Sequence, residues 1–351
     1  MNVKSILILM KSIILILLFS ACYNPSATVS DSATAVTYKT YTTADGLPSN
    51  TISGVWVLSK QIFLATPSGL ALSHDDGSSW TIKTTSDGLA GNVVQAVRAQ
   101  GTKIVVGTST GLSVSTNSGS TWTTYTTSTT KAIAGNNVLS LYLESSTIMA
   151  GTNTGLSITN DFGSNWTNST TTNGLGSNTV NGVWDYNGEA YYAATDYGLS
   201  VSNDGSIWTN YTTANGLPDN KINSVYAGYL KVYAATANGF AISTITPTTQ
   251  ESITTNLDSK WVVRTKESNG LGSNNVHSFF LSGNCCSNTL FTATANGLST
   301  SASVVGSWGG VSWKTKTTSN GLASNNVLDI CVNSDASAIY VATDNGLTKL
   351  W

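Results

Sequence analysis

The sequence has few charged residues, and this shortage limits what the protein can bind. Lysine and arginine together number 16 of 351 residues, aspartate and glutamate number 18, and the formal net charge is −2. The only arginines are Arg98 and Arg264. Binding a phosphate backbone takes a cluster of basic side chains, so the composition excludes nucleic acid as a partner.

Histidine is scarcer still, with only His74 and His277. Neither has a second histidine, a cysteine or a paired carboxylate at the spacing of metal ligands. The glycines recur in turns and not in a phosphate-binding loop before a helix. We therefore expect no metal and no cofactor. The hydrophobic content of 40% is nevertheless sufficient for an ordered core.

The N-terminus holds an apolar stretch that Lys4 precedes and Lys11 interrupts, and it ends in Phe-Ser-Ala-Cys22. A basic start, an apolar stretch and small residues before a cut site are typical of a secretory signal. The ending resembles the lipobox of bacterial lipoproteins, which implies a signal peptide at 1–21 and an acylated Cys22. The small, polar residues up to 35 would form a flexible tether. An uncleaved anchor or an ordinary cleaved signal is the alternative, but Lys11 leaves too short an apolar span for a membrane helix.

A turn motif recurs through the rest of the chain, as in TTADGLPSN at 42–50 and TTANGLPDN at 212–220. Its closing residues are Asn50, Asn92, Asn136, Asn178, Asn220, Asn274 and Asn325. A Thr-x-x-Gly motif follows each turn, and six of the seven units then have a tryptophan: Trp80, Trp122, Trp166, Trp208, Trp261 and Trp313.

A period of about 42 residues with four short β segments is typical of a propeller blade. We predict an all-β chain that forms a seven-bladed β-propeller over residues 36–351. The seventh unit ends after three strands, before its tryptophan. Residues 36–43 carry Tyr38 at the corresponding position, so they should supply the missing outer strand and close the ring.

Between the third and fourth strands the first unit reads Ser-His-Asp75-Asp-Gly-Ser-Ser-Trp80, and the residues equivalent to Asp75 are Asn117, Asp161 and Asp204. This motif resembles the Asp-box (BNR repeat) of sialidase-type propellers, which implies a structural carboxylate that caps a hairpin. The turn and the Thr-x-x-Gly motif resemble the two-component regulator propeller repeat. The resemblance covers residues 36–351 and implies an extracellular sensor or scaffold module.

A sialidase needs three arginines on its substrate carboxylate, which two arginines cannot supply. Another glycoside hydrolase, or a lyase, would need only two carboxylates across a cleft. The acids available on the d–a turns and b–c loops, counting strands a to d outward in each blade, are Asp45, Asp87, Asp196, Asp219 and Asp344. Most occupy positions that other units fill with Asn, which indicates turn formers.

Two pairs depart from the repeat on that face, Asp196 with Tyr197 and Asp219 with Lys221, and we predict a ligand site there. The opposite face carries insertions at 245–260 and 302–312, the second with Trp308. These are either loops that grew at little cost or a binding patch with Trp308 as its anchor.

Three cysteines remain after Cys22. A disulfide from Cys285 or Cys286 to Cys331 would suit an oxidising compartment; three reduced thiols are the alternative. The sequence thus predicts a non-catalytic, monomeric, lipid-anchored propeller in the cell envelope, on the periplasmic side or at the outer membrane or cell surface, that binds a protein or glycan. The alternative is a glycoside hydrolase or lyase.

Overall fold

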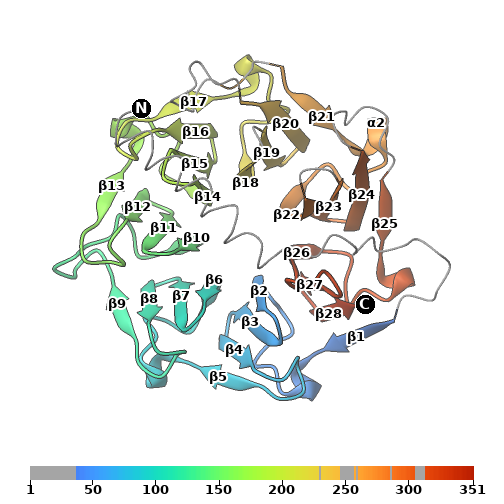
Figure 1. Ribbon diagram of the computed structural model, residues 1–351, viewed down its shortest axis with the longest axis horizontal. Helices are drawn as coiled ribbons and strands as arrows, with labels where there is room; N and C mark the ends of the chain where they lie inside the picture. The colour runs from blue at the N-terminus through green and yellow to red at the C-terminus, as the bar shows by residue number, and fades with distance from the viewer. Residues whose placement is uncertain (1–36, 229–230, 246–256, 258–259, 285–286, 305–312) are drawn as a thin grey trace, which may run out of the picture.

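The computed structural model is a ring of seven four-stranded antiparallel sheets around a central axis (Figure 1). It describes residues 37–228, 231–245, 257, 260–284, 287–304 and 313–351. The predicted fold, a seven-bladed β-propeller, is confirmed. In each blade the first strand lies nearest the axis and the last forms the rim, so the strands are lettered a to d outward.

The bounds of the strands follow the repeat closely. Blade one contains β2 (Gly54–Leu58), β3 (Gln61–Thr66), β4 (Gly69–Ser73) and β5 (Thr81–Lys83). Blade two contains β6 (Val94–Gln100), β7 (Lys103–Thr108), β8 (Gly111–Ser115) and β9 (Thr123–Tyr125). Blade three contains β10 (Val138–Glu144), β11 (Thr147–Thr152), β12 (Leu156–Thr159) and β13 (Thr167–Ser169). Blade four contains β14 (Val180–Tyr186), β15 (Ala190–Thr195), β16 (Gly198–Ser202) and β17 (Thr209–Tyr211). Blade five contains β18 (Ile222–Gly228), β19 (Lys231–Thr236), β20 (Gly239–Thr244) and β21 (Val262–Arg264). Blade six contains β22 (Val276–Asn284), β23 (Ser287–Thr294), β24 (Gly297–Val304) and β25 (Lys314–Lys316). Blade seven contains β26 (Val327–Val332), β27 (Ile339–Thr343), β28 (Gly346–Leu350) and, from the N-terminus, β1 (Tyr38–Tyr41).

The N-terminal strand closes the ring as predicted. β1 pairs antiparallel with β28, with Tyr38 opposite Leu350 and Tyr41 opposite Leu347. The backbone N–H groups of Thr37 and Trp351 donate to each other's carbonyls at 3.2 and 3.1 Å. The last blade therefore has four strands like the others, and the two ends of the described chain lie side by side (Figure 1).

Each turn between blades is held by the asparagine that closes the repeated motif. Its side-chain carbonyl accepts a hydrogen bond from a backbone N–H seven to nine residues earlier, at 2.6 to 2.8 Å in all seven turns. Most of these turns contain a short helix: η2 (Thr43–Asp45), η3 (Thr85–Asp87), η4 (Thr171–Asn173), η5 (Thr213–Asn215), α2 (Lys266–Asn269) and η6 (Thr318–Asn320).

The short helices are capped at both ends by the repeated residues. In the first, the Thr42 hydroxyl accepts from Ala44 N, and the Asp45 carboxylate accepts from Thr42 N at 2.9 Å, which makes a capping box. Gly46 ends the turn with φ at +96°, a left-handed conformation that favours glycine. The leucine after the glycine is buried between blades, as Leu47 and Leu89 are at 4% exposure.

One ionic cluster joins the closing blade to the first blade. Asp76, in the β4–β5 hairpin of blade one, pairs with Lys349 of β28 at 2.5 Å and accepts from the Tyr340 hydroxyl at 2.6 Å. Its backbone carbonyl accepts from the Tyr41 hydroxyl at 3.2 Å. Burial alone would raise the pKa of Asp76, but the hydrogen bonds from Lys349 and Tyr340 outweigh it and lower that pKa. Three strands of blade seven, β1, β27 and β28, thus contact blade one through Asp76.

We predict that Lys349→Met lowers the free energy of unfolding more than Lys83→Met does. Lys349 is 13% exposed in its ion pair, and we expect its loss to cost about 1–2 kcal/mol, because the Asp76 carboxylate is still partly solvated. Lys83 pairs with Asp87 at 3.6 Å within one blade and is more exposed, so its loss should cost less than about 0.5 kcal/mol. Urea denaturation at pH 7 measures both values, and equal losses would contradict a special role for the closing seam.

Candidate binding face

The d–a turns and the b–c loops open on one end of the ring, which we call the turn face. The a–b and c–d hairpins open on the other, which we call the hairpin face. On the turn face each b–c loop is held by its threonine. In blade five, for example, the Thr236 hydroxyl donates to Gly239 O at 2.7 Å and accepts from Asn238 N. The same two bonds recur at Thr66, Thr108, Thr152, Thr195, Thr294 and Thr343.

Asp219 lies in the turn between blades four and five, where its carboxylate accepts from Lys221 N at 2.8 Å. A serine hydroxyl makes the equivalent bond in four other turns, at Ser49, Ser177, Ser273 and Ser324. Asp219 therefore serves the same local function as these serines and, unlike them, adds a negative charge to the turn face.

Asp196 and Tyr197 lie in the b–c loop of blade four. The Asp196 carboxylate accepts from Asn181 Nδ2 at 2.9 Å, and Tyr197 is 58% exposed. Gly198, next in that loop, donates its N–H to Asn220 O at 2.7 Å. The structure thus brings the two loops that carry the predicted residues together at one seam, between blades four and five.

A set of polar side chains near the axis was missed by the sequence analysis. Asn181 Nδ2 donates to Ile222 O at 3.0 Å, and Asn223 Nδ2 donates to Val276 O at 2.7 Å. His277 Nδ1 lies 2.8 Å from Val327 O and must carry the proton, since a carbonyl can only accept. Each of these residues is the second residue of an inner strand, and it bonds to the first residue of the inner strand in the next blade. Comparing the residues at this one position of the repeat could therefore have revealed them.

The other acids of the turn face are engaged in local hydrogen bonds. The backbone N–H of Thr84 holds the pKa of Asp87 below its ordinary value, and a hydrogen bond from Ser324 does the same for Asp344. Both side chains therefore stay ionised at neutral pH. A glycoside hydrolase also needs a carboxyl group that is protonated, which these two residues do not provide.

The residues of the predicted Asp-boxes lie on the hairpin face. Asp75 accepts from Ser79 N and Ser79 Oγ at 2.9 and 2.6 Å, and these bonds lower its pKa to about 2. Asp161 accepts from Asn165 N at 2.8 Å, Asn117 accepts from Thr121 N at 2.9 Å, and Asp204 from Ser206 N at 2.8 Å. These bonds cap the c–d hairpins of blades one to four.

The remaining predictions concern the cysteines and Trp308. Cys331 is buried in β26, and its side chain packs with residues of blade one such as Val57. Cys285, Cys286, Trp308 and the predicted lipidation residue Cys22 lie outside the described residues, so the bridge, the patch and the anchor stay predictions.

Asp185, near the hairpin-face end of β14, is a second group that the sequence analysis missed. It stands where other inner strands have Val57, Ala99 or Ala227, which is a visible departure from the repeat. The residue is only 6% exposed, and desolvation is the main cause that raises its pKa to about 6. Gly188 N donates to its carboxylate at 2.7 Å and offsets part of that effect.

Comparison with known proteins returned no matching family model and no curated relative. Among solved structures, the chain is similar to the extracellular domain of the hybrid two-component system BT3049 from B. thetaiotaomicron (TM-score 0.67, 16% identity, 90% of this chain and 41% of that one). It is also similar to YCF48 bound to a D1 peptide (TM-score 0.59, 14% identity, 91% and 96%). A third similar structure is the GH74 xyloglucanase from Xanthomonas campestris (TM-score 0.61, 13% identity, 89% and 53%).

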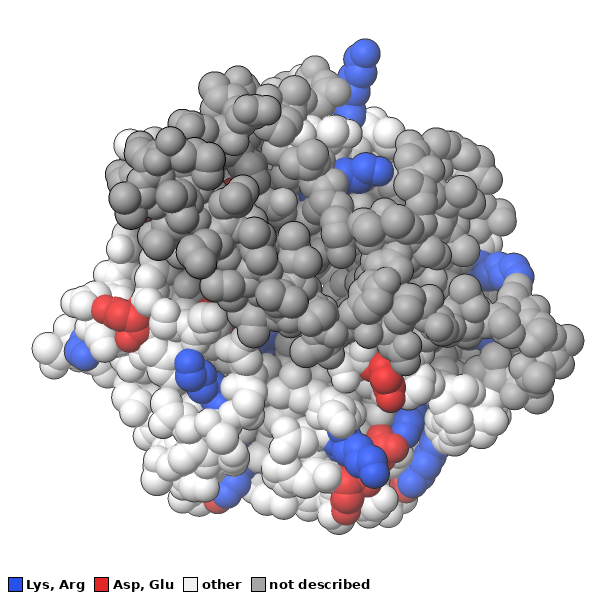
Figure 2. All heavy atoms as spheres, viewed as in Figure 1, with Lys and Arg blue, Asp and Glu red and all other residues white. Residues whose placement is uncertain are grey.

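These likenesses concern the fold, because identity is low throughout. The chain spans about two fifths of the length of the BT3049 domain. Within the described ranges, we found no helix with the length and apolar character needed to cross a bilayer, and no group of three or more metal-binding side chains. In Figure 2, described charged side chains of both signs lie close together toward the lower right of the face in view, and the rest of the described surface there carries few.

We predict that Asp185→Asn stabilises the protein at neutral pH and not in acid. The pKa of Asp185 in the folded protein is about 6, above the ordinary value of 3.8, so folding disfavours the ionised carboxylate. The resulting loss of stability begins as the pH rises above 3.8 and grows until about pH 6. Asparagine removes a penalty of at most about 3 kcal/mol at pH 7.5 and almost none at pH 3.5. Chemical denaturation at both pH values measures the gain.

Asp335→Asn is the matched control, because a hydrogen bond from Ser337 lowers the pKa of Asp335. Its stabilising charge is present above pH 4 and is lost as the pH falls through the folded pKa, so this variant should lose stability at pH 7.5. A gain for Asp185→Asn that is the same at both pH values would show that its cause is not the buried charge.

Proposed function

We propose that the protein is a non-catalytic, lipid-anchored propeller of the cell envelope that binds a peptide or a glycan through its turn face. Two kinds of relative support this. The BT3049 structure is an extracellular domain of a signalling protein, and the YCF48 structure has a peptide bound. Both structures share the fold of this chain over about nine tenths of its length.

The observation that carries the proposal is the seam between blades four and five on the turn face. There an exposed tyrosine, Tyr197, stands beside Asp196 and close to the charged turn of Asp219 and Lys221. At the position of Tyr197 the other blades have Ser, Thr or Asn, and at the position of Asp219 the other turns have Ser or Gly. An exposed aromatic ring flanked by groups of both signs is a typical anchor for a binding partner.

The alternative function, a glycoside hydrolase or lyase, is favoured by the GH74 structures among the similar folds. The turn face offers that chemistry poor support, because Asp87 and Asp344 are held as anions by their hydrogen bonds. Asp185, which does have a raised pKa, is buried near the hairpin face.

We predict that Tyr197→Ala weakens partner binding at least tenfold, because the loss of a central aromatic anchor costs 2 kcal/mol or more. Glycan and peptide arrays probed with the chain from residue 22, carrying Cys22→Ala for solubility, identify the partner, and calorimetry gives the affinities. Val93→Ala is the control, since Val93 is also an exposed apolar residue next to a turn, in another blade, with 44% exposure. Equal effects of the two variants, or turnover of an arrayed glycan, would overturn the proposal.

The lipid anchor has its own test. In a Gram-negative host, the full-length chain should appear in the membrane fraction, and Cys22→Ala should move it to the soluble fraction, because a thioether-linked lipid is the only anchor that the proposal includes. Cys331→Ala is the matched control and should leave the distribution unchanged. Membrane association that survives Cys22→Ala would show that another segment anchors the protein.

A further inference from the structure

The seam between blades three and four differs from the other seams at three repeat positions. Strand d of blade three ends in Ser169, where the other blades have a long side chain: Tyr41, Lys83, Tyr125, Tyr211, Arg264 and Lys316. Tyr191 is the second residue of strand b in blade four, where the earlier blades have isoleucine: Ile62, Ile104 and Ile148. Ile207, 75% exposed, stands in the Asp-box of blade four where the others have Ser79, Thr121 or Asn165.

The long side chain at the end of strand d fills space against the next blade. The Tyr41 ring lies against Gly77 of blade one, and a Cβ atom added to Gly163 of blade three would meet the Tyr125 ring. The short Ser169 side chain reaches only far enough to donate to Gly205 O, at 3.0 Å. The nearest side chains to Gly205 are instead Ile158 and Tyr191. At this seam Ile158 and Tyr191 therefore border the glycine that a tyrosine ring borders at two other seams.

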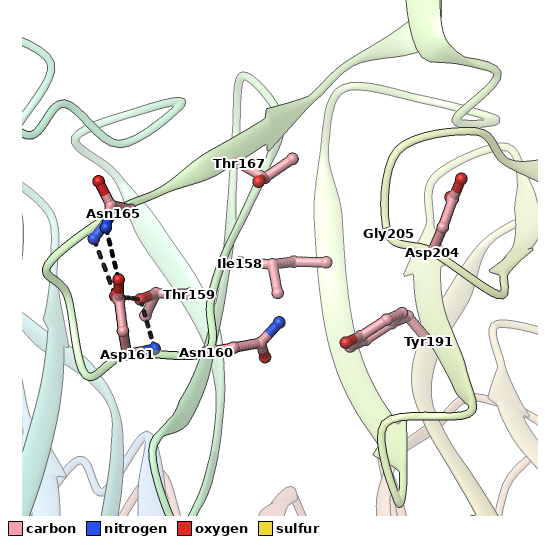
Figure 3. A pocket seen from close by; sticks show the side chains of 9 residues that line it. All are labelled: Ile158, Thr159, Asn160, Asp161, Asn165, Thr167, Tyr191, Asp204 and Gly205. Carbon is pink, nitrogen blue, oxygen red and sulfur yellow. Dashed lines mark hydrogen bonds between the residues drawn. The ribbon is translucent and has the colours of Figure 1, made fainter. Parts of the chain in front are cut away.

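A pocket of about 260 Å³ lies at this seam (Figure 3). Ile158 and Tyr191 are buried and form its floor, while Asn160, Asn165, Thr167 and Asp204 line its exposed rim. Figure 3 shows Ile158 and Asn160 pointing into the space from blade three, and Tyr191 pointing into it from blade four. The floor is thus apolar and aromatic, and the rim is polar.

The rim offers hydrogen-bond donors and acceptors side by side. Thr147 Oγ1 donates to Asn160 Oδ1 at 3.1 Å, and the Asn160 amide nitrogen is directed into the pocket (Figure 3). The Tyr191 and Thr167 hydroxyls can both donate and accept. No lysine or arginine lines the pocket, whereas the carboxylates of Asp161 and Asp204 do.

We propose that this pocket binds one neutral sugar ring of a glycan. Each hydroxyl of a sugar donates and accepts at once, which a rim of amide, hydroxyl and carboxylate groups satisfies, and its C–H face suits the floor formed by Ile158 and Tyr191. The two carboxylates exclude acidic sugars by repulsion. The inference goes beyond the proposed function, because it names one class of ligand and a second site, on the hairpin face and separate from Tyr197.

Ser169→Tyr tests the proposal by restoring the side chain that the neighbouring seams contain. Saturation-transfer NMR on the full chain with Cys22→Ala should show transfer to at least one of methyl glucoside, galactoside and mannoside, and none to glucuronate. We expect Ser169→Tyr to weaken that binding at least tenfold, while Ser169→Ala, which keeps the pocket open, changes it less than threefold. Thermal melting checks that each variant folds.

Asn160→Ala provides a second variant at an exposed position that folding does not require, and it should weaken binding at least fivefold. The absence of transfer to any neutral glycoside, equal binding by Ser169→Tyr and wild type, or transfer to a tripeptide such as Gly-Lys-Gly in place of sugars would each overturn the inference. Partner binding that is lost in Tyr197→Ala, together with no transfer to any neutral glycoside, would leave the proposed function intact and would refute this site alone.

Discussion

The pairing of β1 with β28 is the interaction on which the rest of the ring depends. Each blade buries its two faces only against its neighbours, so an open ring would expose one face of blade one and one of blade seven. The four residue pairs from Tyr38↔Leu350 to Tyr41↔Leu347 prevent this. The Asp76 cluster adds an ionic contact across the same seam. Closure therefore combines a backbone ladder at the rim with side-chain bonds at the hairpin face.

Regular hydrogen bonds make the turn face uniform, while the hairpin face varies. Asparagine side chains hold every turn, and threonine side chains hold every b–c loop, with the same hydrogen bonds. Ligand contacts on this face can therefore vary only at residues that take no part in these bonds, such as Tyr197. Seams at the hairpin face depend on side-chain volume. The seam that holds the pocket, between blades three and four, is also the one where strand d ends in a short residue, Ser169, which bonds to Gly205 O.

The fold could be predicted in detail because the repeat encodes it seven times, once for each blade. Asn220 and its counterparts bond as a local turn requires, and Tyr38 placed the closing strand correctly. The site was harder to predict. Asp219 departs from the repeat yet makes the bond that serine makes elsewhere, whereas Asp185, Ser169 and Tyr191 depart from it without a recognised motif. Their importance depends on burial and on which blade each side chain faces, and a single sequence does not report either.

The position of the two chain ends also determines how the molecule responds to force. Thr37 and Trp351 are neighbours at one end of the β1–β28 ladder, and the rest of β1 runs away from that end. A pull on the segment before Thr37 therefore loads the backbone hydrogen bonds one after another, as in the opening of a zipper, and does not shear them together. The closing strand is consequently the mechanical weak point of the ring, and tension on a tether would detach β1 before it disturbed any other blade.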